Sequence, residues 1–479
     1  MSPCGIRLRS GDEQRQHERN TEIAKRIAGG DSKQTRKHQK ANQVVKDAND
    51  DPCPRRRRET RLAQCGEPVH GPFAGENSLT GRCQDAGGGC EQEWVAGEHG
   101  KSSTCNEPLR HIKWRGMVSS NRNWLAEKVL AGERISPDEA LELYRFRLEE
   151  LGALANARRD LAKEKSYDGR GREIVTYIVD RNINYTNVCN VYCKFCAFYR
   201  TERDEDHYVL SFEQIDRKLD ELSAAGGVQI LMQGGHHPKL PFTWYIDLLH
   251  HIRKKYPQIN IHGFSPPEFQ HFAETFRMPL RETISEFKKA GLGSIPGGGG
   301  EILVDRVRKK ISPLKIDSNQ WLEVMQVAHE LGLKSSATMM FGHVETIEDR
   351  VEHLQRIRDQ QDRSGGFTAF ICWTFQPQHT VLKIKYPTGV AEYLRTQALA
   401  RIFLDNIDNV QSSWVTQGPG IGQVALKYGA NDFGSVMMEE NVVSSAGTTF
   451  RLNAAEIESL IRDAGYEPHR RNNWYELLN

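Results

Sequence analysis

Long hydrophobic runs are absent from this sequence of 479 residues. No apolar stretch approaches the roughly 20 residues that a helix needs to cross a bilayer, and the N-terminus lacks the apolar core of a secretory signal peptide. An excess of one charge is also absent, because 65 lysines and arginines nearly balance 63 aspartates and glutamates. The net charge of +2 gives no general attraction to nucleic acid or to anionic lipid. We therefore predict a cytoplasmic protein that binds neither nucleic acid nor membrane.

Cysteine is absent between residues 106 and 188 and again after Cys372. Six of the ten cysteines lie in the first 105 residues, and these six do not show the close pairing of a metal site. An even number of cysteines indicates disulfides in short secreted chains, a class that this long sequence without a secretion signal does not match. We interpret the early cysteines as incidental, and Cys372, in an apolar strand-like run, as a core residue.

Residues 1–116 also lack any helix or strand periodicity, and no apolar run among them exceeds three residues. They contain a basic block at residues 55–58 and a glycine run at residues 87–89. Such a segment cannot bury enough apolar surface to offset the entropy lost on ordering. We predict that it is disordered, or that it is not natural protein, since Met117 could serve as the true start. The alternative is a basic tail that contacts RNA or a partner protein.

Helical and strand-like patterns of apolar residues begin after Met117. Residues 124–129 fit a short amphipathic helix. The sequence Ser136-Pro137-Asp138-Glu139 is a capping box with proline at the first helical position, which predicts a helix through Leu148. We therefore predict a helical N-terminal cap over residues 117–170.

Residues 171–479 alternate between strand-like and helical patterns. The predicted strands are Ile183–Thr186, Val228–Met232, Ile259–Phe264, Ser294–Ile295, Ser335–Phe341 and Phe367–Phe375, with a weaker pair at Ser412–Val415 and Asp432–Val436. The predicted helices are Phe212–Ala225, Trp244–Tyr256, Leu280–Ala290, Gln320–Leu331, Thr346–Gln361 and Glu392–Asn406. Such alternation indicates an α/β fold with a parallel sheet covered by helices. Six to eight units in one run favour a (β/α)8 barrel of the TIM type, which the C-terminal strands and helices would close.

Three cysteines follow the first predicted strand of this barrel. Cys189, Cys193 and Cys196 have the spacing C-x3-C-x2-C. Three thiolates on one short loop can ligate three irons of a [4Fe–4S] cluster and leave the fourth iron without a protein ligand. An open metal position is typical of a catalytic site. A structural zinc site is the alternative, but zinc usually takes two ligand pairs and no second pair follows.

The open iron predicts S-adenosylmethionine (SAM) as a co-substrate. The amino and carboxylate groups of SAM can chelate that iron, and an electron from the cluster then breaks a carbon–sulfur bond of the sulfonium. The products are methionine and a 5′-deoxyadenosyl radical. The cluster motif therefore indicates a radical SAM barrel.

Several residues at the strand ends are candidates for binding SAM. Gln233, Gly234 and Gly235 end the second strand, where glycines allow close approach of the methionine part, although a tight turn explains them too. In the run Gly297–Gly300 the bare backbone indicates a bound ligand. Glu301 then binds a ribose hydroxyl, or it is a carboxylate stabilised at a helix N-terminus. Phe195 flanks the adenine or packs against its own loop.

The segment Cys189–Arg200 resembles the radical SAM enzymes of the futalosine route to menaquinone and the related deazaflavin (FO) synthase subunits. Five further stretches make residues 117–479 most similar to the cyclic dehypoxanthinyl futalosine synthase family. These stretches are Arg181–Asn187, Gln233–Pro238, Ser265–Glu268, Thr338–Thr346 and Gly429–Ser435. One departure is Gly300, where we expect alanine in this family.

The resemblance implies a reaction and its partners. The deoxyadenosyl radical takes hydrogen from C4′ of the ribose of dehypoxanthine futalosine, and the carbon radical adds to the substrate's own ring. Loss of an electron and a proton gives a spirocyclic precursor of the naphthoquinone, and SAM is consumed. A reducing donor such as flavodoxin or ferredoxin is implied.

Ring closure within one substrate needs a dry, shaped pocket and a base for the final proton. Histidine titrates near neutrality and suits that role. The candidate bases, each of which is alternatively structural or a substrate contact, are His236, His237, His262, His343 and Glu345. Glu268 and Arg200 contact the substrate carboxylate region or pair on the surface. Gly298 and Gly299 are candidates for the substrate site because they sit in the glycine run.

Three other functions compete with this interpretation. Aminofutalosine synthase uses the same radical to join two substrates, but the sequences of residues 182–187 and 265–268 argue against assigning this chain to that enzyme. An FO synthase subunit is the second alternative. A non-catalytic iron–sulfur or zinc protein is the third, and the absence of a fourth ligand beside the three cysteines argues against it.

Overall fold

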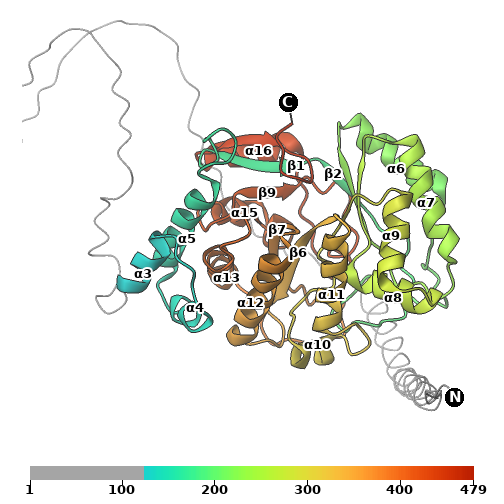
Figure 1. The fold of residues 1–479 in the computed structure, drawn as a ribbon, viewed down its shortest axis with the longest axis horizontal. Coiled ribbons are helices and arrows are strands. Elements are labelled where there is room, and N and C mark those ends of the chain that lie inside the picture. The colour runs from blue at the N-terminus through green and yellow to red at the C-terminus, as the bar shows by residue number, and fades with distance from the viewer. Residues whose placement is uncertain (1–122, 479) are drawn as a thin grey trace, which may run out of the picture. The chain divides into compact units, whose positions relative to one another are not determined.

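A computed structural model describes residues 123–478 of the chain, whose course is shown in Figure 1. Residues 1–122 and 479 lie outside this part, and with them the predictions for residues 1–116. Among the described residues, no helix combines the length and apolar character that a membrane span requires.

Three helices precede the first strand, and the sequence explains where they begin. They are α3 (Asn123–Leu130), α4 (Pro137–Leu143) and α5 (Leu148–Lys163). The predicted capping box forms at α4, where Ser136 N donates to the Glu139 carboxylate at 2.7 Å. The helix predicted through Leu148 is wrong in its extent, because Arg147 has an extended backbone and starts a second helix. Helix α5 then packs along α13 (Val390–Phe403).

Ten strands form one parallel sheet in the order β10-β1-β9-β8-β7-β6-β5-β4-β3-β2. The strands are β1 (Ile174–Ile178), β2 (Asp180–Ile183), β3 (Gln229–Met232), β4 (Asn260–Gly263), β5 (Ser294–Ile295), β6 (Lys334–Phe341), β7 (Phe367–Thr374), β8 (Val410–Gln411), β9 (Asp432–Ser435) and β10 (Glu467–Arg470). Every pairing between them is parallel. The predicted parallel α/β fold is confirmed.

The barrel closes because β1 and β2 are parts of one stretch of chain, separated only by Val179. The first part pairs with β9 and the second with β3, which are otherwise far apart in the sheet. Main-chain bonds continue the ladder on both sides, from Val436 N to Ile178 O (3.0 Å) and from Val228 N to Val179 O (3.1 Å). Residues 174–183 therefore count as one strand of an eight-stranded barrel, with β10 added outside β1. This is the predicted (β/α)8 architecture.

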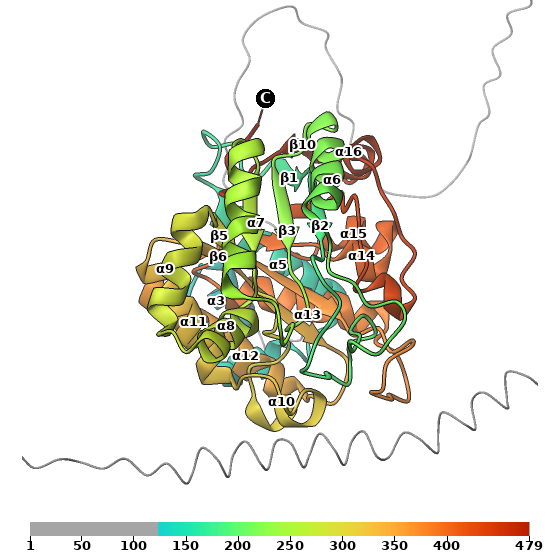
Figure 2. The same cartoon turned by 90° about the vertical axis from the view of Figure 1, so that its right-hand side faces the viewer.

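Helices surround the barrel on its outside (Figures 1 and 2). They are α6 (Phe212–Ala224), α7 (Phe242–Lys255), α8 (Pro266–Phe276), α9 (Leu280–Ala290), α10 (Asp305–Ile311), α11 (Ser318–Glu330), α12 (Ile347–Ser364), α13, α14 (Trp414–Gln417), α15 (Pro419–Ala425) and α16 (Ala454–Asp463). Each long helix turns an apolar stripe inward, as α9 does with Ile284 and Phe287. The ring of Phe287 lies 4.9 Å from that of Phe264, which directly follows β4.

Two predicted strands are misplaced. The strand predicted at Ile183–Thr186 ends at Ile183 and begins at Ile174 instead. It was missed because the polar residues 180–182 interrupt its apolar run, although all of them are buried. The strand predicted at Ser412–Val415 is wrong, since β8 ends at Gln411 and Trp414 begins α14.

A buried ion pair ties the end of the chain to the barrel. The Arg471 guanidinium contacts the Asp432 carboxylate through two bonds of 2.5 and 2.9 Å, and neither side chain is more than 6% exposed. Asp432 also accepts a hydrogen bond from Thr176 of β1 at 2.5 Å. Arg471 directly follows β10, so this pair fixes the outer strand and β9 to the same part of β1.

Replacement of Arg471 by methionine should lower the free energy of unfolding by about 3–5 kcal/mol, because it leaves the Asp432 carboxylate buried without its cation. Urea unfolding followed by circular dichroism measures this loss. The control is Arg462→Met, which removes an exposed pair with Glu458 and should cost about 1 kcal/mol or less. Equal losses in the two variants would contradict the role given to Arg471.

Candidate active site

The three predicted cluster cysteines lie on residues 187–200, the cluster loop, which follows β2. Two main-chain bonds close its base, from Cys189 N to Arg200 O (2.9 Å) and from Arg200 N to Asn187 O (2.7 Å). The Asn187 amide holds the same base, since it donates to Asp206 O at 2.9 Å and accepts from Tyr208 N at 2.8 Å. The cysteines are therefore carried on a closed turn.

The thiols of Cys189, Cys193 and Cys196 share one electrostatic environment. Burial raises the pKa of each above its ordinary value, while the Lys315 ammonium opposes this by favouring the thiolate form. Two of the sulfurs also accept main-chain N–H groups. The donors are Val191 and His236 for Cys189, and Phe198 and Tyr199 for Cys196.

The chemistry of these donors fits an iron–sulfur cluster, although within residues 123–478 no three His, Cys, Asp or Glu side chains are already arranged to hold a metal ion. Buried thiolates are costly unless positive charge lies beside them, and iron supplies that charge. N–H groups directed at the sulfurs are a feature through which proteins tune such clusters. The donor set of three thiols and the surrounding amides is therefore suited to the predicted [4Fe–4S] cluster.

The glycines after β3 are required by close packing against the segment that follows β2. A Cβ on Gly235 would come within 2.2 Å of Val188 O, in the cluster loop, and one on Gly234 within 2.4 Å of the Tyr185 ring, just before that loop. A side chain at Gly235 would therefore displace the cluster loop, and one at Gly234 would displace Tyr185.

A cavity of about 300 Å³ lies inside the barrel beside these loops. Among the predicted site residues, it is lined by Gln233, His262, Gly298, Gly299 and Glu301. Its wall also includes residues that the sequence did not single out, among them Asp180, Asn182, Trp414 and Arg471.

Two buried oxygens in the cavity wall have no hydrogen-bond partner among the described residues. They are Oδ1 of Asn182 and Oε2 of Glu301, and both side chains belong to residues only 6% exposed. An unpaired buried acceptor is costly, so each is suited to a donor from a ligand. The other oxygen of Glu301 accepts from Lys315 at 2.9 Å.

Lys315 connects the cavity with the cluster loop. Its ammonium pairs with Glu301 of the cavity wall and acts on all three thiols. It also lies 5.1 Å from the centre of the Phe195 ring, so this charge contacts the aromatic side chain that precedes Cys196. One lysine therefore touches both parts of the site.

Of the five candidate bases, His262 alone lines the cavity. Its Nδ1 lies 2.8 Å from Ser294 Oγ, and burial together with the nearby Arg471 lowers its pKa to about 3. The ring is thus neutral at pH 7. His262 is therefore better suited to form a hydrogen bond with a ligand than to act as the base that takes up the substrate's proton.

His236 and His237 lie in the loop after β3, away from the cavity wall. His236 is half-buried beside the ring of His271, 4.9 Å away, and desolvation of the imidazole holds its pKa well below the ordinary value. The His237 Nδ1 accepts from Lys239 N and from Leu240 N, both at 3.1 Å. The described contacts of His237 are therefore those of a residue that shapes its loop.

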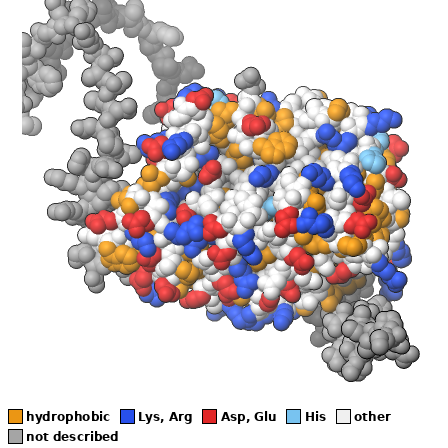
Figure 3. All heavy atoms as spheres, in the orientation of Figure 1, with side chains coloured by type: hydrophobic (Ala, Val, Ile, Leu, Met, Phe, Trp, Pro, Cys, Tyr) orange, Lys and Arg blue, Asp and Glu red, His pale blue; other side chains and the backbone are white. Residues whose placement is uncertain are grey.

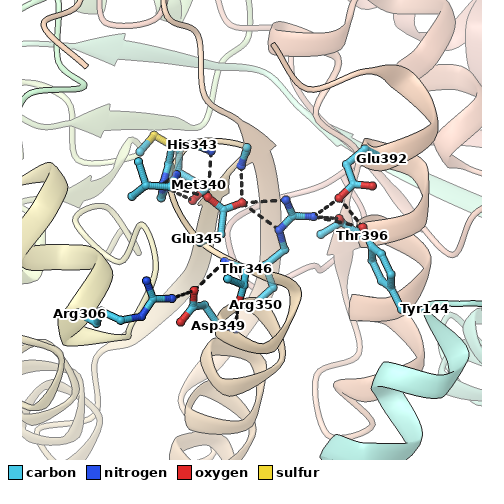
Figure 4. Close-up of polar contacts among 12 residues, drawn as sticks. Tyr144, Arg306, Met340, His343, Glu345, Thr346, Asp349, Arg350, Glu392 and Thr396 are labelled. Atoms are coloured by element: carbon cyan, nitrogen blue, oxygen red, sulfur yellow. Dashed lines mark hydrogen bonds and ion pairs between the residues drawn. The ribbon is translucent and has the colours of Figure 1, made fainter. Parts of the chain in front are cut away.

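His343 and Glu345 lie in a buried ion network after β6, shown in Figure 4. Glu345 contacts His343 at 2.9 Å and Arg350 at 2.8 Å, and the two predicted side chains are at most 1% exposed. Arg350 continues to Glu392 at 2.5 Å, and Glu392 accepts from the Tyr144 hydroxyl of the N-terminal helices. These two candidates therefore bind the barrel to its helical cap.

Glu268 and Arg200 are also bonded to protein groups. The buried Glu268 completes the capping box of α8 and accepts from the Tyr185 hydroxyl (2.8 Å) and from Gly234 N (3.1 Å). Arg200 pairs with Asp206 at 2.7 Å, which is the surface alternative considered for it. Glu268 supports the loop that meets the cluster loop.

Sequence reasoning missed Lys315 and Asn182. Lys315 follows Glu301 by 14 residues and belongs to no motif, so only the folded chain reveals it. Asn182 did give a signal, because it is a polar residue within a strand that is buried throughout.

Comparisons with known proteins agree with this geometry. A family model described as the radical SAM superfamily matches residues 183–357, and one described as the CofH/MqnC C-terminal region matches residues 364–479. A cyclic dehypoxanthine futalosine synthase of Halalkalibacterium halodurans is 44% identical over 355 residues, which cover 74% of this chain and 94% of that relative. An aminodeoxyfutalosine synthase of Thermus thermophilus is 37% identical over 360 residues, covering 73% and 94%. The crystal structure of methylornithine synthase has the same fold, with a TM-score of 0.56 at 18% identity over 72% of this chain and 97% of that one.

Replacement of Glu345 by glutamine should destabilise the protein by about 3 kcal/mol at pH 7, because Arg350 loses a buried anion. Burial by itself would raise the pKa of Glu345, but His343, Arg350 and the N–H of Gly342 together hold it below its ordinary value of 4.5. Its contribution is therefore complete above pH 4.5 and is lost as the pH falls through the lower folded value.

Urea unfolding at several pH values measures both effects. The stability of the wild type should fall more steeply below pH 4.5 than that of the variant. Glu352→Gln removes an exposed pair with Arg356 and serves as the control. An unchanged unfolding free energy combined with lost turnover would instead support Glu345 as the base.

Proposed function

Because the chain belongs to the family of the cyclic dehypoxanthine futalosine synthases, within the radical SAM superfamily, we propose that it converts dehypoxanthine futalosine to its cyclic product. The reaction forms one carbon–carbon bond within the substrate and consumes SAM. It serves menaquinone biosynthesis by the futalosine pathway. A reducing compartment such as the cytoplasm suits it, because three free thiols must stay reduced to bind iron.

The observation that carries this proposal is the junction between the cluster loop and the barrel cavity. Lys315 pairs with Glu301 of the cavity wall at 2.9 Å, and its charge acts on all three thiols of the cluster loop. A ligand that contacts Glu301 is therefore adjacent to the cysteines. Radical chemistry needs this proximity, because the 5′-deoxyadenosyl radical must abstract a hydrogen atom from the substrate before side reactions consume it.

Cys189, Cys193 and Cys196 would hold the [4Fe–4S] cluster. When bound, the cluster supplies the electron that splits SAM into methionine and the 5′-deoxyadenosyl radical. Phe195, Gln233, Gly234, Gly235 and Glu301 are proposed to contact SAM. Of these, Glu301 has the clearest support, since its unpaired Oε2 can accept hydrogen bonds from ribose hydroxyls.

The substrate is proposed to occupy the deeper part of the cavity. Asn182 Oδ1 can accept a hydrogen bond from a substrate hydroxyl, and the neutral His262 can bond a second group. Gly298 and Gly299 leave the wall open beside them. Enclosure by the barrel keeps water from the carbon radical, which favours ring closure over side reactions.

Anaerobic turnover with dithionite, SAM and dehypoxanthine futalosine tests this function. We expect about one 5′-deoxyadenosine for each cyclised product, because each closure consumes one SAM. Cys196→Ser should abolish both products. The matched control is Cys372→Ser, at a cysteine of β7 that does not belong to the cluster loop. Cys372 Sγ donates to Gln397 Oε1 at 3.0 Å, and a serine hydroxyl can replace this hydrogen bond. Deoxyadenosine without cyclised product, or an aminofutalosine-type coupling of two substrates, would overturn the proposal.

Asn182→Leu should raise the KM for dehypoxanthine futalosine by about ten-fold, because the acceptor for a buried hydroxyl is lost. The unfolding free energy should change little, since Oδ1 has no partner among the described residues. Asn182→Asp keeps an acceptor oxygen in place and should bind better than the leucine variant. An unchanged KM for Asn182→Leu would place the substrate elsewhere.

A further inference from the structure

The cluster loop is held between two other segments of the chain at Lys194, which stands between the second and third cysteines. Lys194 N donates to Ile311 O of α10 at 2.9 Å, and Lys194 O accepts from Leu382 N at 2.7 Å. The two partners belong to residues 306–316, after β5, and residues 376–389, after β7. All three segments therefore meet at the carboxyl end of the barrel strands, beside the cysteines.

These three segments carry lysines and no carboxylates. Residues 189–200, 306–316 and 376–389 contain neither aspartate nor glutamate. Their exposed lysines, which we call the basic surface, are Lys194, Lys309, Lys310, Lys383 and Lys385. Within residues 123–478, none of the five forms an ion pair. Figure 3 shows blue side chains along the lower edge of the molecule, over α10, and Figure 2 places α10 at the same end.

Nearby acidic residues do not neutralise the basic surface. The loop after the cluster loop contains four carboxylates, and the described contacts of three of them lie within their own neighbourhood. Asp206 pairs with Arg200, Glu202 with Lys239, and Asp204 accepts from the Thr201 hydroxyl. Asp305 and Asp317, which flank residues 306–316, accept from Ser318 N and Gln320 N at 2.9 Å each. None of these carboxylates has a described ion pair with a lysine of the basic surface.

Exposed apolar side chains accompany these lysines. Val381 is 64% exposed and Tyr386 is 74% exposed, both within residues 376–389. The Lys385 ammonium lies 5.0 Å from the centre of the Tyr386 ring, which presents an aromatic face and a charge together. Apolar and aromatic residues inside a charged rim are typical of protein interfaces.

We infer that the basic surface docks an acidic protein that carries one electron to the cluster. The inference rests on the proposed function, in which the cluster must be reduced before it can split SAM. In that step the reduced carrier loses one electron and the cluster gains it, with no bond formed between the proteins. Charge complementarity favours an acidic partner, because five exposed lysines without an ion pair attract a negatively charged protein surface. Contact at Lys194 would bring the carrier within two residues of the ligands Cys193 and Cys196.

Charge reversal of four lysines tests the inference in the cluster-loaded protein. The variant is Lys309→Glu, Lys310→Glu, Lys383→Glu and Lys385→Glu combined, with Lys194 left intact because it adjoins the cysteines. The probe is an acidic flavodoxin. Its Kd for the protein, measured by titration calorimetry at low salt, should rise about ten-fold or more in the variant. In the wild type the Kd should rise with added salt.

A second readout is the rate at which reduced flavodoxin reduces the cluster, followed by its visible absorption. We expect this rate to fall in the variant while reduction by dithionite stays unchanged, since that small reductant needs no docking. The matched control is Lys165→Glu with Lys254→Glu. Both of these exposed lysines precede a strand and so lie at the opposite end of the barrel.

An unchanged Kd and reduction rate in the four-lysine variant would overturn the inference, as would an equal loss in the control. Equal loss with flavodoxin and dithionite would also overturn it, because the substitutions would then have damaged the cluster site itself. Both readouts are independent of dehypoxanthine futalosine. If the wild type takes up electrons but yields no cyclised product, the proposed function fails while the docking surface stands.

Discussion

The closure of the barrel at Val179 is the constraint on which the rest of this structure depends. Before this residue the first strand pairs with β9, and after it the strand pairs with β3. Without these two pairings the sheet would have open edges here and no enclosed interior. The same strand runs directly into the cluster loop, so the element that completes the cavity also delivers the cysteines to its mouth.

Electrostatics couple the cavity to the cysteines through a short chain of charges. Glu301 lies between Lys315 and Arg308, at 2.9 and 3.7 Å, and Lys315 acts on the thiols. Buried charges of this kind persist only when each has a partner. Glu301 Oε2, the oxygen nearer Arg308, accepts no hydrogen bond from the described residues, so it can still accept one from a ligand in the cavity that Glu301 lines.

The sequence allowed the alternation of strands and helices, the cysteine loop and the capping boxes to be predicted, because each depends on residues close together in the chain. It failed where position depends on the folded barrel. His343 and Glu345 follow β6 as catalytic residues often do, yet their side chains enter a structural ion network. The sequence indicates that a residue follows a strand, but it does not indicate whether its side chain points into the cavity or into the surrounding protein. Lys315 could not be found for the same reason, since its partners come from the cluster loop as well as from the loop after β5.

The arrangement of loops around the barrel separates two tasks that meet at the cluster. The cluster loop faces the cavity through Lys315 and Glu301 on its inner side, and its outer side carries Lys194. Loops after β2, β5 and β7 build both sides, and the order of strands in a closed barrel brings these loops to one end. Substrate can therefore be enclosed by the barrel while electrons arrive from outside it. A cluster held by the three cysteines of this loop would keep its fourth position open, while the exposed Lys194 on the same loop would stay available to a partner.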